Sequence, residues 1–385
     1  MSKQFHDEEF GSSTLLKLDI FRRYVREWIP VFLTTYKEKH NFQRVCLFDF
    51  FSGPGMDAAG NLGTPTIIYD ELKKYCSTHS NKKSKSVAVD LFFNDIESDK
   101  VETLKQHLAS IECSQRCCTV HTLCSPFDNL LGLDTIKQPL QSPNTACLVI
   151  IDQFGIKHVD RDVFRFFAAC PRTDIMFFLS SSFVRRFADD ASFNTRLPIT
   201  PEKIKQTSHK QIHRELCECY KSLIPSTTPY HLSQFSFEKV GNIYGIIFGS
   251  GSLLGLEKFL KVAWIMDKDT GEANYDIDDD PIRKSRGQKF LIDDMNGYKK
   301  LNAFEDELKK LLISKPTDNL YLYQFCLERG FLPKQMSELL RKWQDEKILQ
   351  VYDPATGATP RKGTFYIAWE YFKKNEQKLL FHIKE

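Results

Sequence analysis

A chain of 385 residues has room for two domains and a further small module. Its apolar content of 42% and charged content of 27% are ordinary for a globular protein, and no segment reaches the roughly 18 apolar residues that a membrane span requires. The polar, acidic start from Met1 to Gly11 does not resemble a secretory signal, and the 11 cysteines lack the spacing of a disulfide framework. We therefore expect a soluble cytoplasmic protein with reduced thiols.

The formal net charge of +3 is unevenly distributed along the chain. From Pro281 onward there are 20 Lys and Arg against 14 Asp and Glu, which leaves residues 1–280 with a net charge of −3. This asymmetry favours contact between the C-terminal part and a polyanion. A solvated surface rich in lysine explains it equally well.

The first predicted element is an amphipathic helix over Leu15–Tyr36, in which Leu18, Phe21, Val25 and Trp28 recur at helical spacing. Strands are then predicted at Val45–Phe50, Val87–Phe93, Cys118–Thr122, Cys147–Ile151, Ile175–Ser180 and Ile243–Ser250. Helices are predicted at Pro65–Tyr75, Lys100–Ile111, Phe127–Thr135, Arg161–Ala169, Pro201–Leu223 and Leu253–Ile265. Several strands are apolar throughout, as expected where helices cover both faces of a parallel sheet, so the pattern predicts a doubly wound α/β domain.

A winged-helix module is predicted after a polar linker. Its elements are three helices and a strand pair, at Leu301–Ile313, Leu320–Arg329, Pro333–Glu346, Ile348–Tyr352 and Thr364–Ala368. The basic residues at positions suited to phosphate contact are Lys334, Arg341 and Lys342 in the third helix, and Arg361 and Lys362 in the wing. Winged helices also serve as protein–protein adaptors, so both kinds of partner remain open. The predicted organisation is an N-terminal helical extension (1–40), an α/β domain (41–270), a linker (271–298) and a winged-helix domain (299–385).

A tight turn of small residues follows the first predicted strand. Asp49 ends the strand, and Ser52, Gly53 and Gly55 form the turn, where glycine allows the main chain to approach a ligand closely. In an open α/β sheet, nucleotide-like ligands bind at the carboxyl ends of the strands. A Gly-x-Gly turn alone is weak support for such a ligand, because many turns of this kind are structural.

Acidic residues follow the second strand, where Asp95 and Glu97 are placed to accept the hydroxyls of a ribose. The 40 positions from Gly55 to Asp95 exceed the roughly 20 that are typical of dinucleotide sites. Asp95 as the N-cap of a helix is the alternative interpretation.

Two further strand ends complete the candidate site. After the third strand, Ser125 and Phe127 could place a polar group and an aromatic ring against a purine, although a helix start explains them too. After the fourth strand, Asp152 and Phe154 could accept a proton and hold a planar ring, although an Asx-type turn is the alternative. No metal site is expected, because the helical pair His209 and His213 lacks a neighbouring glutamate and the cysteines lack paired Cys-x2-Cys spacing.

These motifs resemble those of the Rossmann-like S-adenosylmethionine-dependent methyltransferases. More narrowly, they are similar to the family of three-Cys-motif partner proteins. The resemblance rests on Lys17, Tyr24, Asp49–Gly55, Gly63–Pro65, Asp95–Glu97, Ile151–Gly155, Phe248–Ser250 and Gly255–Leu256. The family's usual Asp-Pro-Phe-Gly is Asp-Gln-Phe-Gly in this chain, and its Gly-Ser-Pro is Gly-Thr-Pro.

The resemblance implies S-adenosylmethionine as the cofactor. It also implies a partner, a radical-SAM-like protein with three cysteines. The first hypothesis is a methyltransferase that acts on a nucleic acid or a nucleotide, with the winged helix docking the substrate. The second hypothesis is a non-catalytic partner or regulator, which Gln153 in place of the family's proline favours.

Overall fold

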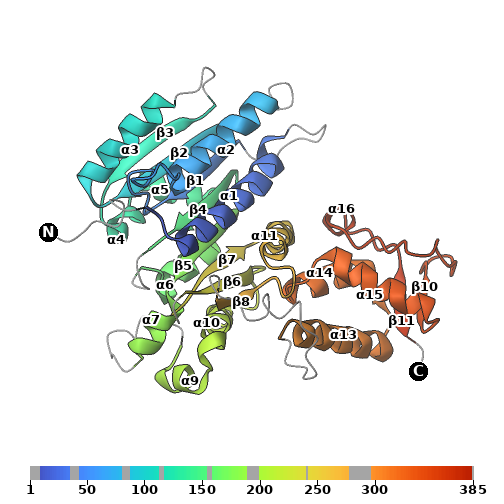
Figure 1. The fold of residues 1–385 in the computed structure, drawn as a ribbon. Helices are drawn as coiled ribbons and strands as arrows, with labels where there is room; N and C mark the ends of the chain where they lie inside the picture. The colour runs from blue at the N-terminus through green and yellow to red at the C-terminus, as the bar shows by residue number, and fades with distance from the viewer. Residues whose placement is uncertain are drawn as a thin grey trace. The chain divides into compact units, whose positions relative to one another are not determined.

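The computed structural model describes residues 9–34, 43–79, 87–111, 117–153, 158–188, 199–239, 242–276 and 296–383 (Figure 1). The chain divides into two compact units. The N-terminal unit comprises Met1–Lys258 with Asn274–Asp280, and the C-terminal unit comprises Phe259–Ala273 with Pro281–Glu385. Within the described ranges, none of the helices has both the length and the apolar character that crossing a membrane demands.

An eight-stranded sheet forms the centre of the N-terminal unit, in the order β3-β2-β1-β4-β5-β7-β6-β8. Strands β1 to β5 are parallel, whereas β7 is antiparallel to both β5 and β6. The strands are β1 (Arg44–Asp49), β2 (Ala88–Asp95), β3 (Thr119–Cys124), β4 (Thr145–Ile151), β5 (Thr173–Leu179), β6 (His231–Lys239), β7 (Asn242–Ser250) and β8 (Ala273–Asp276). The order reverses between β1 and β4, which is where an open α/β sheet places its ligand.

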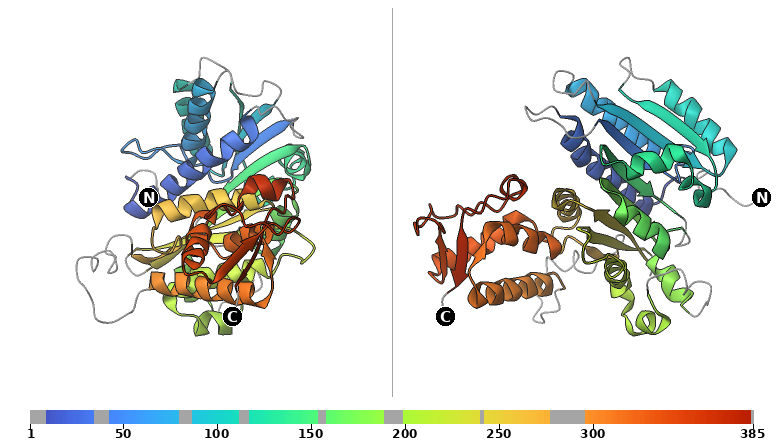
Figure 2. Two further views of the ribbon diagram at one scale, coloured as in Figure 1. Left: turned by 90° about the vertical axis from the view of Figure 1, so that its right-hand side faces the viewer. Right: turned by 180° about the vertical axis from the view of Figure 1, so that it is seen from behind.

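Helices cover both faces of this sheet, as Figures 1 and 2 show. They are α1 (Ser12–Leu33), α2 (Thr64–Thr78), α3 (Ser98–Ser110), α4 (Phe127–Leu130), α5 (Asp134–Gln141), α6 (Arg161–Ala169), α7 (Ser181–Arg186), α9 (Pro201–Gln206), a 3-10 turn (His209–Gln211), α10 (Ile212–Lys221) and α11 (Leu253–Met266). The helices α1 and α2 pack together, and the α1 ring of Tyr24 lies against Phe248 of β7. The predicted doubly wound, Rossmann-like sheet with a preceding helix is confirmed.

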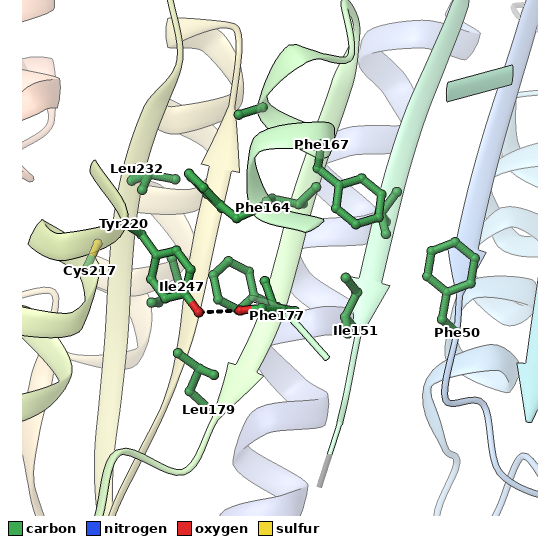
Figure 3. Packing of buried hydrophobic residues seen from close by; sticks show 14 of the residues in the cluster. Phe50, Ile151, Phe164, Phe167, Phe177, Leu179, Cys217, Tyr220, Leu232 and Ile247 are labelled. Carbon is green, nitrogen blue, oxygen red and sulfur yellow. Dashed lines mark hydrogen bonds between the residues drawn. The ribbon is translucent and has the colours of Figure 1, made fainter. Parts of the chain in front are cut away.

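The main hydrophobic core lies on the face of the sheet opposite α1, between the sheet and the helices α5, α6 and α10 (Figure 3). There the ring of Tyr220 packs 5.0 Å from Phe164 and 5.2 Å from Phe177, measured between centroids. Its hydroxyl donates a hydrogen bond of 2.6 Å to the Val159 carbonyl, which satisfies the polar end of a fully buried side chain. Burying each such ring contributes about 1.5–3 kcal/mol.

Several details of the N-terminal unit differ from the sequence prediction; the helix predicted over Phe127–Thr135, for example, is divided into α4 and α5, and β8 is not among the predicted strands. The helix predicted over Pro201–Leu223 is divided into α9, the 3-10 turn and α10, because Thr207 and Ser208 have extended backbone that ends one helix and begins the next. Strand β6 was absent from the prediction. It pairs along its whole length with β7, from His231 opposite Ser250 to Lys239 opposite Asn242.

The C-terminal unit contains the predicted winged helix. Its elements after the linker are α13 (Asn296–Ser314), β9 (Thr317–Asp318), α14 (Asn319–Glu328), α15 (Pro333–Asp345), β10 (Leu349–Tyr352), α16 (Trp369–Lys373) and β11 (Leu380–Ile383). The three strands form a small antiparallel sheet in the order β10-β11-β9.

The predicted second strand of the wing is wrong. Residues Thr364–Ala368 form no strand, since Tyr366 has a positive φ of 54° that interrupts extended backbone. The partner of β10 is β11, nearer the C-terminus. The buried Asn319 side chain holds this longer connection, because its amide binds the carbonyls of Tyr366 and Glu376 and its oxygen accepts from the backbone of Lys378 and Leu379.

The end of α11 belongs to the C-terminal unit. Trp264 donates a hydrogen bond of 2.9 Å from Nε1 to the Gly330 carbonyl, and its ring lies 5.7 Å from that of Phe331. Lys300 of α13 forms an ion pair of 2.6 Å with Glu272 and donates to the Thr270 carbonyl. These contacts join Phe259–Ala273 to the winged helix.

Candidate functional site

The turn after β1 is held against the end of β2 by hydrogen bonds. The Ser52 backbone N–H and hydroxyl both donate to the Asn94 carbonyl, at 2.8 and 2.9 Å. Gly53 and Gly55 have φ values of +58° and +89°, a region that side chains disfavour. A Cβ on Gly55 would also lie 2.7 Å from Leu104 Cδ1. Glycine is therefore required at position 55 by both backbone and space.

Asn94 joins three strand ends. Its buried side-chain amide donates to the Phe50 carbonyl at 3.2 Å and to the Ser125 carbonyl at 3.0 Å, and its oxygen accepts from the Ser125 N–H at 3.1 Å. This residue fixes the loops after β1, β2 and β3 relative to one another. Asn94 is not among the predicted site residues, and the signal for it in the sequence is a polar residue at the end of an apolar strand.

Asp95 orders the same turn. Its Oδ2 accepts from the Gly53 N–H at 2.9 Å, and its Oδ1 accepts from the Glu97 N–H at 3.0 Å. Each carboxylate oxygen has a further lone pair for a ligand hydroxyl. The Glu97 carboxylate forms an ion pair of 2.5 Å with Lys100, and Ile96 between the two acids is 64% exposed.

Asp49 is a fully buried carboxyl at the end of β1. Its Oδ1 accepts from the Phe51 N–H at 3.2 Å, whereas its Oδ2 has no partner among the described residues. Burial raises the pKa of Asp49 well above its usual range, and the neighbouring carboxylates of Asp152 and Asp95 raise this pKa further.

Gln153 supplies a second buried group without a partner. Its Oε1 accepts from the His158 N–H at 2.6 Å, but its Nε2 binds nothing within the described ranges. Gln153 follows β4, and β4 pairs directly with β1, which ends at Asp49. An unpartnered acceptor and an unpartnered donor thus lie at neighbouring strand ends, where a polar ligand would satisfy both.

Asp152 is joined to the helix that precedes the sheet. Lys17 of α1 donates to Asp152 Oδ2 at 2.5 Å, and the same ammonium lies 4.6 Å from the centroid of the Phe178 ring. Lys17 was among the residues that carried the family resemblance, but no site role was predicted for it. A lysine on the otherwise apolar stripe of an amphipathic helix was the signal that could have identified it.

The residues after β3 pack inward. Phe127 is 4% exposed, and its ring lies 5.4 Å from Phe51 and 5.3 Å from His158 between centroids. Ser125 is tied to Asn94 through its backbone. The predicted catalytic Phe154, with Gly155, lies outside the described residues. The structure thus brings Asp49, Ser52, Gly53, Asp95 and Asp152 together at the strand ends.

His213, the second histidine of the pair considered above, has a packing role. His213 is buried, with its Nδ1 2.7 Å from Ser181 Oγ and its Nε2 3.2 Å from the Ile246 carbonyl. Both ring nitrogens are therefore used in packing α10, one against α7 and the other against β7 of the sheet. Among the described residues, no group of three or more His, Cys, Asp or Glu side chains is arranged to hold a metal ion.

The five basic residues predicted for nucleic-acid contact are all exposed. Lys342 forms an ion pair of 2.8 Å with Glu305, and Lys362 forms one with Asp345. The connection that carries Arg361 lies against α15, because the Gly363 N–H donates to Gln344 Oε1 at 3.1 Å.

One comparison with known proteins agrees with the winged helix in the C-terminal unit. Residues 274–356 match a family model described as a GMT-like wHTH domain. Among curated proteins, none matches the sequence. The C-terminal unit thus carries a winged-helix domain that follows a Rossmann-like α/β unit.

Several solved structures are similar to the chain. An O-methyltransferase from Bacillus cereus in complex with SAH is 9% identical with a TM-score of 0.32, and the match covers 64% of this chain and 83% of that one. The O-methyltransferase TomG from Streptomyces achromogenes in complex with SAM is 9% identical with a TM-score of 0.30, over 60% and 78% of the two chains. A spermidine synthase from Thermotoga maritima is 13% identical with a TM-score of 0.29, over 63% and 62%. Identities and TM-scores this low assign neither a substrate nor a reaction.

Proposed function

We propose that this protein is an S-adenosylmethionine-dependent methyltransferase that acts on a nucleic acid or a nucleotide. The observation that carries this proposal is the meeting of Asp49, Asp95 and Asp152 at the carboxyl ends of the adjacent strands β1, β2 and β4. The strand order of the sheet reverses between β1 and β4, so a ligand is expected at this point.

The residues at the strand ends fit a nucleoside that carries a cationic amino-acid tail. Asp95 would accept the ribose hydroxyls, and the exposed Ile96 side chain would cover one face of the purine. Asp49 Oδ2, which has no partner among the described residues, would accept from the ammonium group. A cation at that position favours the ionised carboxylate and so compensates the cost of burying it. The Gln153 amide would donate to the tail carboxylate.

The remaining site residues fit a transfer reaction. S-adenosylmethionine would supply a methyl group whose bond to sulfur breaks as its bond to the acceptor forms, leaving a thioether and releasing one proton from the acceptor. Asp152 would take that proton, and the hydrogen bond from Lys17 would fix the orientation of its carboxylate. The winged helix, with Lys334, Arg341 and Arg361 exposed, would dock the substrate.

Calorimetric titration of the full chain with S-adenosylmethionine and S-adenosylhomocysteine tests the proposal. We expect both to bind, and we expect Asp152→Ala to keep the affinity within about threefold while losing transfer, because the side chain acts on the acceptor. A protein that binds neither compound is not this enzyme. Loss of cofactor affinity in Asp152→Ala would instead place Asp152 in the cofactor site.

A second candidate function is that of a non-catalytic partner of a radical-SAM-like protein with three cysteines, as the resemblance to three-Cys-motif partner proteins implies. Gln153 favours it, because its Oε1 is committed to the His158 backbone and the residue is fully buried. Cofactor binding without turnover on any nucleotide, together with stable co-purification of such a protein, would support this alternative.

A further inference from the structure

Three aromatic rings lie together on the sheet beside the Lys17–Asp152 pair. They belong to Phe178 of β5, Phe237 of β6 and Tyr244 of β7. The ring centroids of Phe178 lie 6.1 Å from Phe237 and 6.0 Å from Tyr244, and those of Phe237 and Tyr244 are 6.2 Å apart. The planes differ by 28°, 11° and 21° in the same order. We call these three rings the aromatic shelf.

The rings of the aromatic shelf do not form a single linear stack. Three rings in one stack would place the outer two about twice as far apart as neighbours, whereas these centroids are equally spaced. Phe237 is buried, while Phe178 and Tyr244 are half-buried, so part of the aromatic surface is open to a ligand. The shelf is on the same sheet face as α1, because the Lys17 ammonium lies over Phe178.

The position of the shelf relates it to the candidate site. Phe178 is the last residue but one of β5, and Tyr244 lies near the start of the antiparallel β7, next to Gly245, which pairs with Leu179. Both rings are therefore at the carboxyl edge of the parallel strands. Lys17 joins them to Asp152, since its ammonium contacts both Asp152 Oδ2 and the Phe178 ring.

A cation is bound to β7 close to the Tyr244 end of the shelf. The exposed Arg186 of α7 donates from Nη2 to Asn242 Oδ1 at 3.2 Å. Asn242 is two residues from Tyr244 on β7, so the two side chains leave the strand on the same face. An aromatic surface with a guanidinium at its border suits a planar base attached to a phosphate, because base stacking and phosphate binding need these two groups.

We propose that the aromatic shelf binds the acceptor base of a nucleotide or single-stranded nucleic acid, with Arg186 holding its phosphate. This inference rests on the proposed function and adds a substrate subsite to it. The base stacks on the half-buried ring of Tyr244, and its edge then points toward Phe178 and Asp152, because the Lys17 ammonium already lies over the Phe178 ring. Lys17 and Asp152 then mark the boundary between the cofactor and the acceptor.

Fluorescence anisotropy of the full-length protein with a short labelled single-stranded oligonucleotide, as RNA and as DNA, tests this subsite. Tyr244→Leu should weaken binding roughly 5- to 150-fold, the range of one lost base–aromatic stack. Tyr244→Phe, which keeps the ring, should stay within about twofold of the wild type. Arg186→Gln should lower the slope of log Kd against log salt by about 0.7, the contribution of one phosphate contact on a single strand.

The matched control is Tyr321→Leu, which changes a 46% exposed tyrosine of the C-terminal unit. The subsite is overturned if Tyr244→Leu binds the oligonucleotide with the same affinity as the wild type. It is also overturned if Tyr321→Leu loses more oligonucleotide affinity than Tyr244→Leu does. Titration with S-adenosylmethionine is run in parallel on each variant. A wild-type protein that binds S-adenosylmethionine but neither oligonucleotide overturns the subsite alone, whereas one that binds no S-adenosylmethionine overturns the proposed function.

Discussion

Lys17 and Asp152 are 135 positions apart in the sequence, yet the lysine donates a hydrogen bond of 2.5 Å to the carboxylate. Both side chains are largely buried, with 9% and 20% of their surface exposed. Helix α1 is thereby part of the candidate site and not only a cover for the sheet. A buried pair of this kind depends strongly on both of its members, because either charge left alone is costly.

Replacing Lys17 should lower the stability of the folded protein. We expect Lys17→Met to lower the free energy of unfolding by about 1–3 kcal/mol, since it leaves the Asp152 carboxylate without its donor. The double variant Lys17→Met/Asp152→Asn should recover part of that loss in urea unfolding. The control is Lys258→Met, which breaks a more exposed pair with Glu27 and should cost at most about 1 kcal/mol. Equal losses in the two lysine variants would contradict a special role for Lys17.

The turn glycines allow a test that separates backbone strain from crowding. Gly55→Ala must adopt a positive φ and also place its Cβ 2.7 Å from Leu104 Cδ1, so we expect a cost of about 2–5 kcal/mol. Gly60→Ala has a similar φ of +83° with open space around it, so only about 1–2 kcal/mol is expected. Thermal unfolding of both variants measures the difference. Adding Leu104→Ala to Gly55→Ala should reduce the difference; if it does not, crowding by Leu104 is not its cause, although Thr66 Oγ1 would also lie 2.9 Å from the new Cβ.

Asp174 should make stability depend on pH. It accepts hydrogen bonds from the Tyr24 hydroxyl at 2.8 Å and Trp28 Nε1 at 3.0 Å, and burial raises its pKa to about 6 from 3.8. Because this pKa is higher in the folded protein, protonated Asp174 contributes to the free energy of unfolding. This contribution is fully present below pH 3.8 and is lost as the pH rises through about 6. The loss between about pH 5 and 7.5 amounts to about 1–2 kcal/mol.

The variant Asp174→Asn keeps an oxygen acceptor and cannot ionise. Urea unfolding at several pH values should therefore show a smaller decline for Asp174→Asn than for the wild type over this range. Other titrating groups, including Asp49, act equally on both proteins and cancel in the comparison. Parallel curves for the two proteins would show that Asp174 does not titrate in this range.

The winged helix should bind nucleic acid mainly through those basic residues that form no ion pair with an acidic side chain among the described residues. Lys334→Gln or Arg361→Gln should reduce the slope of log Kd against log salt by about 0.7–0.9 each. Lys342→Gln should have a smaller effect, because Lys342 already pairs with Glu305 and would have to break that pair to reach a phosphate. The measurement is a salt titration of affinity for duplex and single-stranded DNA. An unchanged slope in Lys334→Gln and Arg361→Gln would favour a protein partner for this module.

The parallel strands and their carboxyl-end motifs were predictable because they depend on local patterns. Continuous apolar runs identified β1, β2, β4 and β5, and small or acidic residues at their ends identified the turn. The Asn94 bridge and the Lys17–Asp152 pair were not predictable in this way, since each joins segments that are distant in sequence. The wing was mispredicted because Thr364–Ala368 is apolar enough for a strand, while the positive φ of Tyr366 is imposed by tertiary contacts such as that from Asn319.

The contacts of Trp264 decide where the chain can be cut. The winged-helix family model begins at residue 274, but the indole of Trp264 packs on Phe331 and Lys300 binds Glu272 and Thr270. A fragment that started at the family boundary would expose the Phe331 ring and leave the Gly330 carbonyl without its indole donor. Transplanting this winged helix onto another protein therefore requires Phe259–Ala273 as well, so the exchangeable part of the chain begins inside α11.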